Sequence, residues 1–89
     1  MSNFDNKSLY SRGLDLYKNN QLDNSLNFLM RIENKDLNTL KLMSQIHIKK
    51  KSFSIAKTIL IKILKLDKKN LFALNNLGDL NKIERNFEE

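Results

Sequence analysis

The sequence predicts an all-α fold made of helical hairpins that repeat along the chain. Two observations indicate helices: the chain contains no proline and only two glycines, and apolar residues recur every three or four positions in five segments. A third observation indicates hairpins, because short turns between helices of this length place neighbouring helices side by side in antiparallel order. The 89 residues are enough for one domain.

The first hairpin is expected over residues 6–34. Its first helix covers about Lys7 to Asn19, and Asp5 or Asn6 precedes that helix as an N-cap, whose side chain accepts a hydrogen bond from the first turn. Its second helix covers about Asp23 to Glu33. The residues expected to face the interior are Leu9, Gly13, Leu16 and Tyr17 in the first helix, and Leu22, Leu26, Leu29, Met30 and Ile32 in the second.

The second hairpin is expected over residues 36–67. Its helices cover about residues 37–49 and 53–66, and Asp36 and Ser52 are their expected N-caps. The expected interior residues are Leu40, Met43, Ile46 and His47 in the first helix, and Ile55, Ala56, Ile59, Leu60, Ile63, Leu64 and Leu66 in the second. Ile61 lies outside this arc and is expected to be exposed.

A fifth helix is expected over residues 70–87 and acts as a C-terminal capping helix. A stack of repeats needs a terminal element with a polar outer face, because its last apolar face would otherwise meet water. The residues expected to cover the second hairpin are Leu71, Leu74, Leu77 and Leu80. The polar residues Asp79, Asn81, Lys82 and Glu84 are expected to face mainly outward.

The hairpins are copies of each other. Leu9, Leu40 and Leu74 occupy equivalent positions in three successive units. The small residues that follow them by four positions are Gly13, Ser44 and Gly78. In the second helices, the small residues Ser25 and Ala56 are each followed four positions later by a leucine, Leu29 and Leu60. A helix–turn–helix unit with a period of about 34 residues indicates a repeat architecture, in which we expect these small residues to let paired helices approach closely.

In these positions the chain resembles the tetratricopeptide-repeat family, whose unit follows the pattern W-x2-L-G-x2-Y, then A-x3-F, then P. The third unit reads Leu74-x2-Leu77-Gly78-x2-Asn81. The second unit reads Leu40-x2-Met43-Ser44-x2-His47 and then Ala56-x3-Leu60, and the first reads Leu9-x2-Arg12-Gly13-x2-Leu16 and then Ser25-x3-Leu29. The tryptophan and the proline are missing, so the repeats are degenerate. The resemblance implies a right-handed α-α superhelix of two hairpins plus the capping helix.

The sequence offers no recognisable active site. His47 is the single histidine and cysteine is absent, so neither a zinc ligand set nor a thiolate nucleophile can be assembled. His47 lies in the periodic face of its helix, where a packed histidine is the simpler interpretation. No glycine-rich phosphate-binding loop occurs. We therefore expect a protein that is not an enzyme and that uses no cofactor and no metal.

The net charge of +6 is not by itself a sign of an anionic partner. The lysines at positions 49–51 and 68–69 lie at the ends of expected helices, where cations interact favourably with the helix dipole. The sequence is also rich in asparagine and isoleucine, so a compositional bias can account for part of the lysine content. Binding of nucleic acid through phosphate contacts is an alternative, but aromatic residues are few and no nucleic-acid-binding motif occurs. The sequence favours a protein partner.

The resemblance implies a concave groove, lined by the first helix of each hairpin, that binds a peptide or a partner helix. The expected partner-binding residues are Tyr10, Leu14, Tyr17, Lys18, Lys41, Gln45, Lys49, Asn75 and Asn76. Others expected on the same face are Lys7, Asn38, Ile48, Phe72, Asp79 and Lys82. This mixture of aromatic, amide and basic groups suits a peptide of acidic character. The clamp with which some family members hold a C-terminal carboxylate is not reproduced at these positions and is not expected.

The favoured function is therefore that of a protein–protein interaction adaptor. A homodimeric structural module and a basic nucleic-acid-binding helical domain remain as alternatives. The first seven residues lack the apolar core of a signal peptide, and the longest apolar run, residues 59–66, is interrupted by Lys62 and Lys65 and too short to span a bilayer. We expect a cytoplasmic protein without membrane contact.

Overall fold

The computed structural model describes the backbone of residues 5–88 and the side chains of residues 5–84. The all-α class is confirmed, since this part of the chain contains five helices and no strand. The helices are α1 (Asn6–Lys18), α2 (Leu22–Leu29), α3 (Leu37–Lys49), α4 (Phe53–Leu66) and α5 (Leu71–Glu88).

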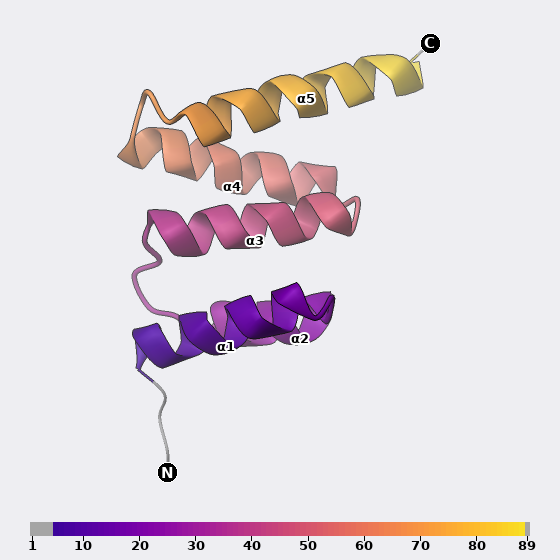
Figure 1. Cartoon of the computed structure of the whole chain (residues 1–89). Coiled ribbons are helices and arrows are strands. Elements are labelled where there is room, and N and C mark those ends of the chain that lie inside the picture. The colour runs from indigo at the N-terminus through magenta and orange to yellow at the C-terminus, as the bar shows by residue number, and fades with distance from the viewer. Residues whose placement is uncertain (1–4, 89) are drawn as a thin grey trace.

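The helices form two antiparallel pairs, α1 with α2 and α3 with α4, and α5 packs on α4 (Figure 1). In this view α2 and α4 lie behind α1 and α3. The front helices also approach one another, because α1 contacts α3 and Lys41 of α3 reaches the ring of Phe72 on α5. Ion pairs also link successive elements, Asp23 of α2 with Lys50 at the end of α3, and Lys57 of α4 with Glu84 of α5.

Two of the three predicted N-caps are confirmed. The carboxylates of Asp5 and Asp36 accept hydrogen bonds from the N–H groups of Ser8 (2.8 Å) and Thr39 (2.9 Å). Ser52 occupies the N-cap position of α4, but its side chain makes no capping hydrogen bond, so that prediction was wrong. The reason is its backbone: ψ is 69° at Ser52, whereas both aspartates have the extended ψ, 171° and 179°, that aims a side chain at the helix.

The turns inside the two helix pairs have the same geometry. Asn20 and Lys51, which occupy equivalent positions in the two pairs, both adopt a left-handed backbone with φ of 62° and 61°. The hydrogen bonds that close these turns are Gln21 N–H to Leu16 O and Ser52 N–H to His47 O, each 2.8 Å long. This is the Schellman arrangement, in which a left-handed residue ends the helix and satisfies its last carbonyl groups.

Helix α2 ends at Leu29, four residues before the predicted end. Beyond it, the N–H of Ile32 donates to Leu29 O over 3.1 Å, a hydrogen bond that spans three residues where an α-helix spans four. Asn34 then turns the chain with φ of 52°. The ammonium of Lys35 donates to Ile32 O at 2.8 Å. These contacts replace the helical turn and direct the chain toward α3, while Ile32 stays buried.

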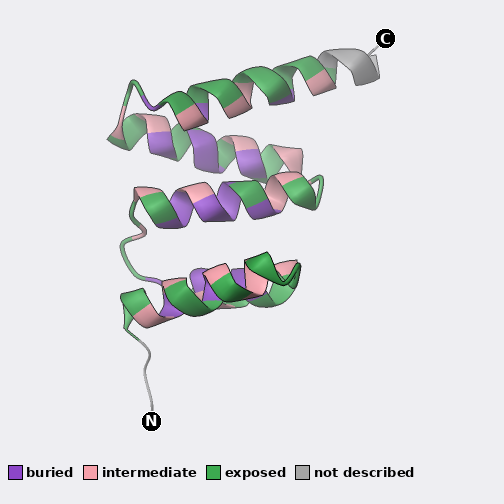
Figure 2. Cartoon of the chain, in the orientation of Figure 1, coloured by how far each residue is buried: buried purple, intermediate pink, exposed green. Residues whose placement is uncertain are grey.

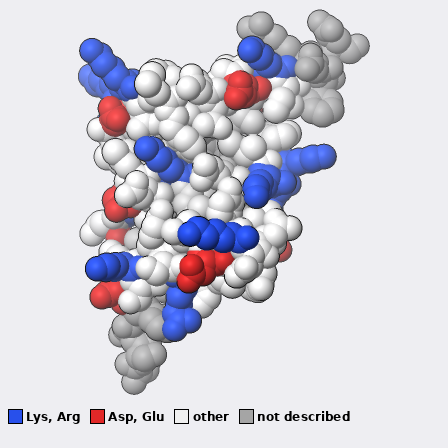
Figure 3. All heavy atoms as spheres, in the orientation of Figure 1, with Lys and Arg blue, Asp and Glu red and all other residues white. Residues whose placement is uncertain are grey.

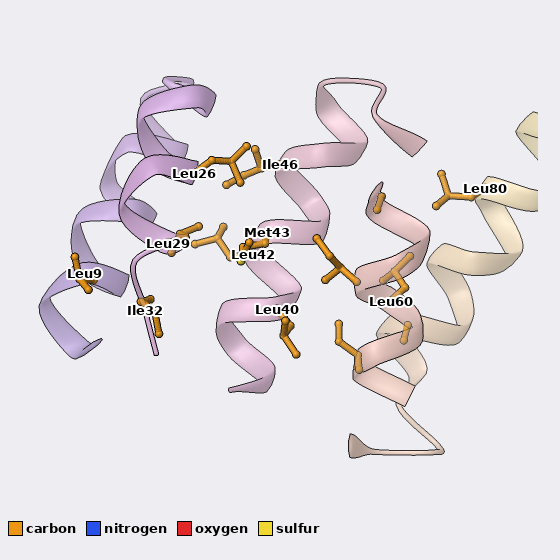
Figure 4. Close-up of a cluster of buried hydrophobic side chains, with 14 residues drawn as sticks. Leu9, Leu26, Leu29, Ile32, Leu40, Leu42, Met43, Ile46, Leu60 and Leu80 are labelled. Carbon is orange, nitrogen blue, oxygen red and sulfur yellow. The ribbon is translucent and has the colours of Figure 1, made fainter. Parts of the chain in front are cut away.

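One continuous apolar core runs through all five helices (Figures 2 and 4). Leu29, Ile46, Leu60 and Ile63 are completely buried in it. Figure 4 shows how the helix pairs join, with Leu26 of α2 directed toward Ile46 of α3. Hydrophobic burial of this kind is the main source of stability in a chain of this size.

Close packing inside the first helix pair depends on Gly13 and Ser25, as predicted. A Cβ atom on Gly13 would lie only 2.6 Å from Leu29 Cδ2. The buried hydroxyl of Ser25 donates to the carbonyl of Gly13 over 2.5 Å. The equivalent residues of the second pair, Ser44 and Ala56, are fully buried as well.

The predicted orientation of α5 is confirmed for Leu77 and Leu80, which lie in or against the core, and is wrong for Leu71 and Leu74. Its buried residues are Ala73 and Leu80, whereas Leu71 and Leu74 are 72% and 46% exposed. Gly78 is also exposed, and a Cβ atom added there would meet nothing within 4 Å. The predicted leucine stripe crosses from the side of α5 that packs on α4 to a side that no described residue covers.

Three further residues expected in the core are exposed, Met30, Ile55 and Leu66. Met30 lies just beyond the end of α2, and Leu66 is the last residue of α4, so both are at the ends of their helices. Helix α4 buries a narrower arc than predicted, formed by Ala56, Ile59, Leu60 and Ile63. Ile61 is exposed, as expected.

Candidate functional site

A pocket of about 270 Å³ lies between the N-terminal ends of α1 and α3. Its lining residues are Asn6, Lys7, Tyr10, Ile32, Asn34, Asp36, Asn38 and Thr39. Lys7, Tyr10 and Asn38 are among the residues predicted for the groove. The lining offers amide, hydroxyl and charged groups around one phenol ring, so the pocket is suited to a polar ligand segment with some apolar surface.

Hydrogen bonds hold the walls of this pocket in place. The side chain of Asn6 donates to Glu33 O at 2.9 Å and accepts from the N–H of Glu33 at 3.2 Å, which ties the start of α1 to the turn after α2. The hydrogen bond from the N–H of Thr39 lowers the pKa of Asp36. Asp36 therefore remains a carboxylate at neutral pH, and Lys7 supplies the opposite charge.

Two lysines of α3 lie against aromatic rings of the neighbouring helices. The ammonium nitrogen of Lys49 is 4.7 Å from the ring centre of Tyr17 on α1, and that of Lys41 is 5.7 Å from the ring centre of Phe72 on α5. Both distances are within the roughly 6 Å at which a cation is attracted by a ring face. The structure thus brings Tyr17 and Lys49 together, and it adds Phe72 as the partner of Lys41.

The other predicted groove residues differ in exposure. Lys18, Gln45 and Asn75 are exposed, and Leu14 is half-buried against the core. Asn76 is half-buried, and its amide donates to Phe72 O over 2.7 Å. This bond fixes the Asn76 side chain along α5.

The space-filling view in the orientation of Figure 1 shows how charge is distributed on this side of the molecule (Figure 3). Lys and Arg side chains occur at several levels of the stack, and uncharged atoms cover much of the area between them. Asp and Glu side chains lie among them. The whole chain carries a net charge of +6, and a net positive charge attracts anionic partners at long range.

His47 has a packing role, as the sequence indicated. Its ring is partly buried in α3, and its Nδ1 atom is buried without a hydrogen-bond partner. Burial lowers the pKa of His47, and the nearby charge of Lys50 lowers it further. The imidazole is therefore neutral at neutral pH.

A lysine cluster that sequence reasoning missed lies between the turn after α2 and helix α4. Lys35, Lys62 and Lys65 surround Leu40 and Leu66 in an open depression of about 400 Å³. In the sequence, the one sign of this lysine cluster is the three-residue spacing of Lys62 and Lys65. The ammonium of Lys35 already donates to a backbone carbonyl, so this lysine has a structural role.

A metal site is not found in the described part of the chain, where no three His, Asp or Glu side chains gather closely enough to hold an ion. None of the helices described is long and apolar enough to cross a membrane. Comparison of the chain with protein-family models, with curated proteins and with solved structures gave no match.

Proposed function

We propose that the chain is a tetratricopeptide-repeat-like adaptor, a right-handed helical-hairpin superhelix that binds an acidic peptide or partner helix on the side formed by α1, α3 and α5. The observation that carries this proposal is the pair of lysine–aromatic contacts on that side, Lys49 with Tyr17 and Lys41 with Phe72. Each contact joins two neighbouring helices, so the binding groups lie across the stack rather than along one helix.

The repeat architecture is supported by what equivalent residues do. Leu9 and Leu40 are 4% and 5% exposed, and both belong to the apolar core. The left-handed turn residues Asn20 and Lys51 recur at equivalent positions of the two pairs. A shared packing position and a shared turn favour duplicated units over two unrelated hairpins.

The lysine–aromatic contacts suit an acidic ligand for a physical reason. A lysine held over a ring keeps its ammonium group at the surface, where it can pair with a carboxylate, while the ring and the lysine methylenes offer apolar contact area. Tyrosine commonly anchors interfaces. The pocket beside Tyr10 would accept a further polar group of the same ligand. A third aromatic residue, Phe28 on α2, lies near Arg12 and Arg31.

The proposal is tested by selecting peptides from a random displayed library on the immobilised chain and mapping the best binder by NMR. The selected peptides should be rich in aspartate and glutamate. Their binding should shift the amide signals of Tyr17, Lys41 and Lys49 more than those of α2 and α4. Shifts concentrated on α2 and α4, or selected peptides without acidic residues, would place the partner elsewhere.

A further inference from the structure

One side of α5 has the features of a packed helix face but lies open. We define the open α5 face by Leu71, Leu74, Gly78 and Asn81, all of which are exposed. Leu74 is equivalent to Leu40, yet it is 46% exposed where Leu40 is 5% exposed. The difference arises because α4 covers this side of α3, whereas no helix of the described residues covers the same side of α5.

The corresponding faces of α1 and α3 are each covered by a helix, and these two helices show what kind of partner such a face binds. On α1, the occupant is α2, which places Leu29 against Gly13 and lets the Ser25 hydroxyl donate to Gly13 O. On α3 the occupant is α4, whose Ala56 and Leu60 are completely buried. Both occupants are antiparallel amphipathic helices in which a small residue is followed four positions later by leucine.

We propose that the open α5 face binds an amphipathic helix of a partner protein, in which a serine, alanine or glycine is followed four residues later by leucine. Gly78 provides the notch for the small residue, because nothing lies within 4 Å of the position where a Cβ atom would stand. A serine in the partner could donate to Gly78 O as Ser25 donates to Gly13 O. The exposed Lys82 at the edge of the face favours an acidic residue on the partner helix.

A second copy of the chain is a poorer occupant. Its own helices of the required type have their small residues and leucines fully buried against α1 and α3, and exposing them would mean opening the fold. Each copy also carries a net charge of +6, which opposes association of two copies. The open α5 face does not include Phe72 or either of the lysines that lie on aromatic rings. The proposed helix partner and the proposed acidic peptide can therefore be tested separately.

The test uses a peptide with the sequence of residues 21–33, which contains the required serine and leucine. In this peptide the changes Asn27→Glu and Arg31→Lys supply a carboxyl and an amine, which are condensed to a lactam that holds the peptide helical; both positions are exposed in the chain. When it is titrated into the whole protein, the amide signals of Leu74 and Gly78 should shift to saturation. A control peptide with Ser25→Phe should bind about tenfold more weakly or worse, because phenylalanine cannot enter the notch.

The matching protein variant is Gly78→Leu, which fills the notch without touching the core. It should keep the helical circular-dichroism signal and lose peptide affinity about tenfold or more, whereas Ser11→Leu, the same kind of change at an exposed position of α1, should bind like the parent. Equal binding to Gly78→Leu, or no binding at about 1 mM peptide, would overturn the proposal. A parent that is dimeric and that Gly78→Leu makes monomeric would also overturn it and identify a second copy as the occupant.

Discussion

Gly13 of α1 and Gly78 of α5, which the sequence pattern aligns with each other, meet opposite surroundings. A Cβ atom at Gly13 would lie 2.6 Å from Leu29 Cδ2 and 2.7 Å from Leu29 Cγ, whereas one at Gly78 would meet nothing within 4 Å. Leu29 is completely buried and cannot move aside without disturbing the core. The same residue type therefore serves close packing in one unit and leaves an open notch in the other.

This contrast predicts opposite effects of one substitution. Gly13→Ala should destabilise the protein by about 1 kcal/mol or more, because overpacking against Leu29 outweighs the gain in helix propensity. Gly78→Ala should stabilise it by about 0.5–1 kcal/mol, since the new methyl group meets no obstacle. Urea denaturation of both variants checks the prediction, and two changes of the same sign would contradict the packing described.

The orientation of α5 predicts a second contrast, between Leu80 and Leu74. Leu80→Ala should cost about 2–5 kcal/mol, because this side chain is 2% exposed and packs against α4. Leu74→Ala should cost less than about 1 kcal/mol, since half of that side chain already faces solvent. Thermal melting of the pair checks this, and equal losses would show that α5 packs through its other side.

Lys51 predicts a stabilising substitution. Its φ of 61° is strained for a residue with a Cβ atom, and its side chain is exposed. Lys51→Gly should raise the free energy of unfolding by about 0.5–1 kcal/mol through relief of this strain. The change Lys50→Gly, one residue earlier and with φ of −81°, should lower it, because glycine gains nothing from this backbone and the ion pair with Asp23 is lost. Chemical denaturation distinguishes the two, and a destabilised Lys51→Gly would refute the turn geometry.

His47 predicts a loss of stability on mild acidification. Burial lowers its pKa in the folded protein, so the unfolded chain takes up a proton first, and stability falls as the pH drops below about 6.5. His47→Leu, which introduces the residue found at the equivalent position 16, should remove this dependence and relieve the unpartnered Nδ1 atom, a gain of about 1 kcal/mol at pH 7.5.

Urea denaturation of parent and variant at pH 7.5 and pH 5 measures this difference. Asp5 and Asp36 do not interfere, because backbone hydrogen bonds lower the pKa of each and they are protonated only at more acidic pH. If the parent and His47→Leu lost equal stability between the two pH values, His47 would not be the group responsible.

Much of the fold follows from the sequence. The spacing of apolar residues predicts five helices, and the positions of Gly13 and Ser25 predict a close contact inside the first pair. The end of α2 was not predictable in this way, because Met30 and Ile32 continue the helical spacing. The helix gives way after Met30 to hydrogen bonds that span three residues, from Arg31 N–H to Phe28 O and from Ile32 N–H to Leu29 O.

The orientation of α5 shows a second limit. The repeat pattern identifies which side of a helix is shaped to receive a partner, but it does not show whether a partner is present. Leu74 and Gly78 match their buried counterparts in sequence and still lie exposed. For the candidate site, the sequence placed Tyr17 and Lys49 on one side, whereas their contact depends on the distance between α1 and α3, which only the packed structure defines.

The proposed binding side is tested most directly by two charge-matched double variants. Lys41→Ala with Lys49→Ala removes both lysines that lie on aromatic rings, and Lys62→Ala with Lys65→Ala removes the same charge from exposed positions of α4. Affinity for the selected acidic peptide is measured by isothermal titration calorimetry at physiological salt. We expect a loss of affinity of about tenfold or more for the α3 variant and of less than about threefold for the α4 variant. Equal losses would contradict it, because they would show that net charge alone, and not the lysine–aromatic contacts, determines binding.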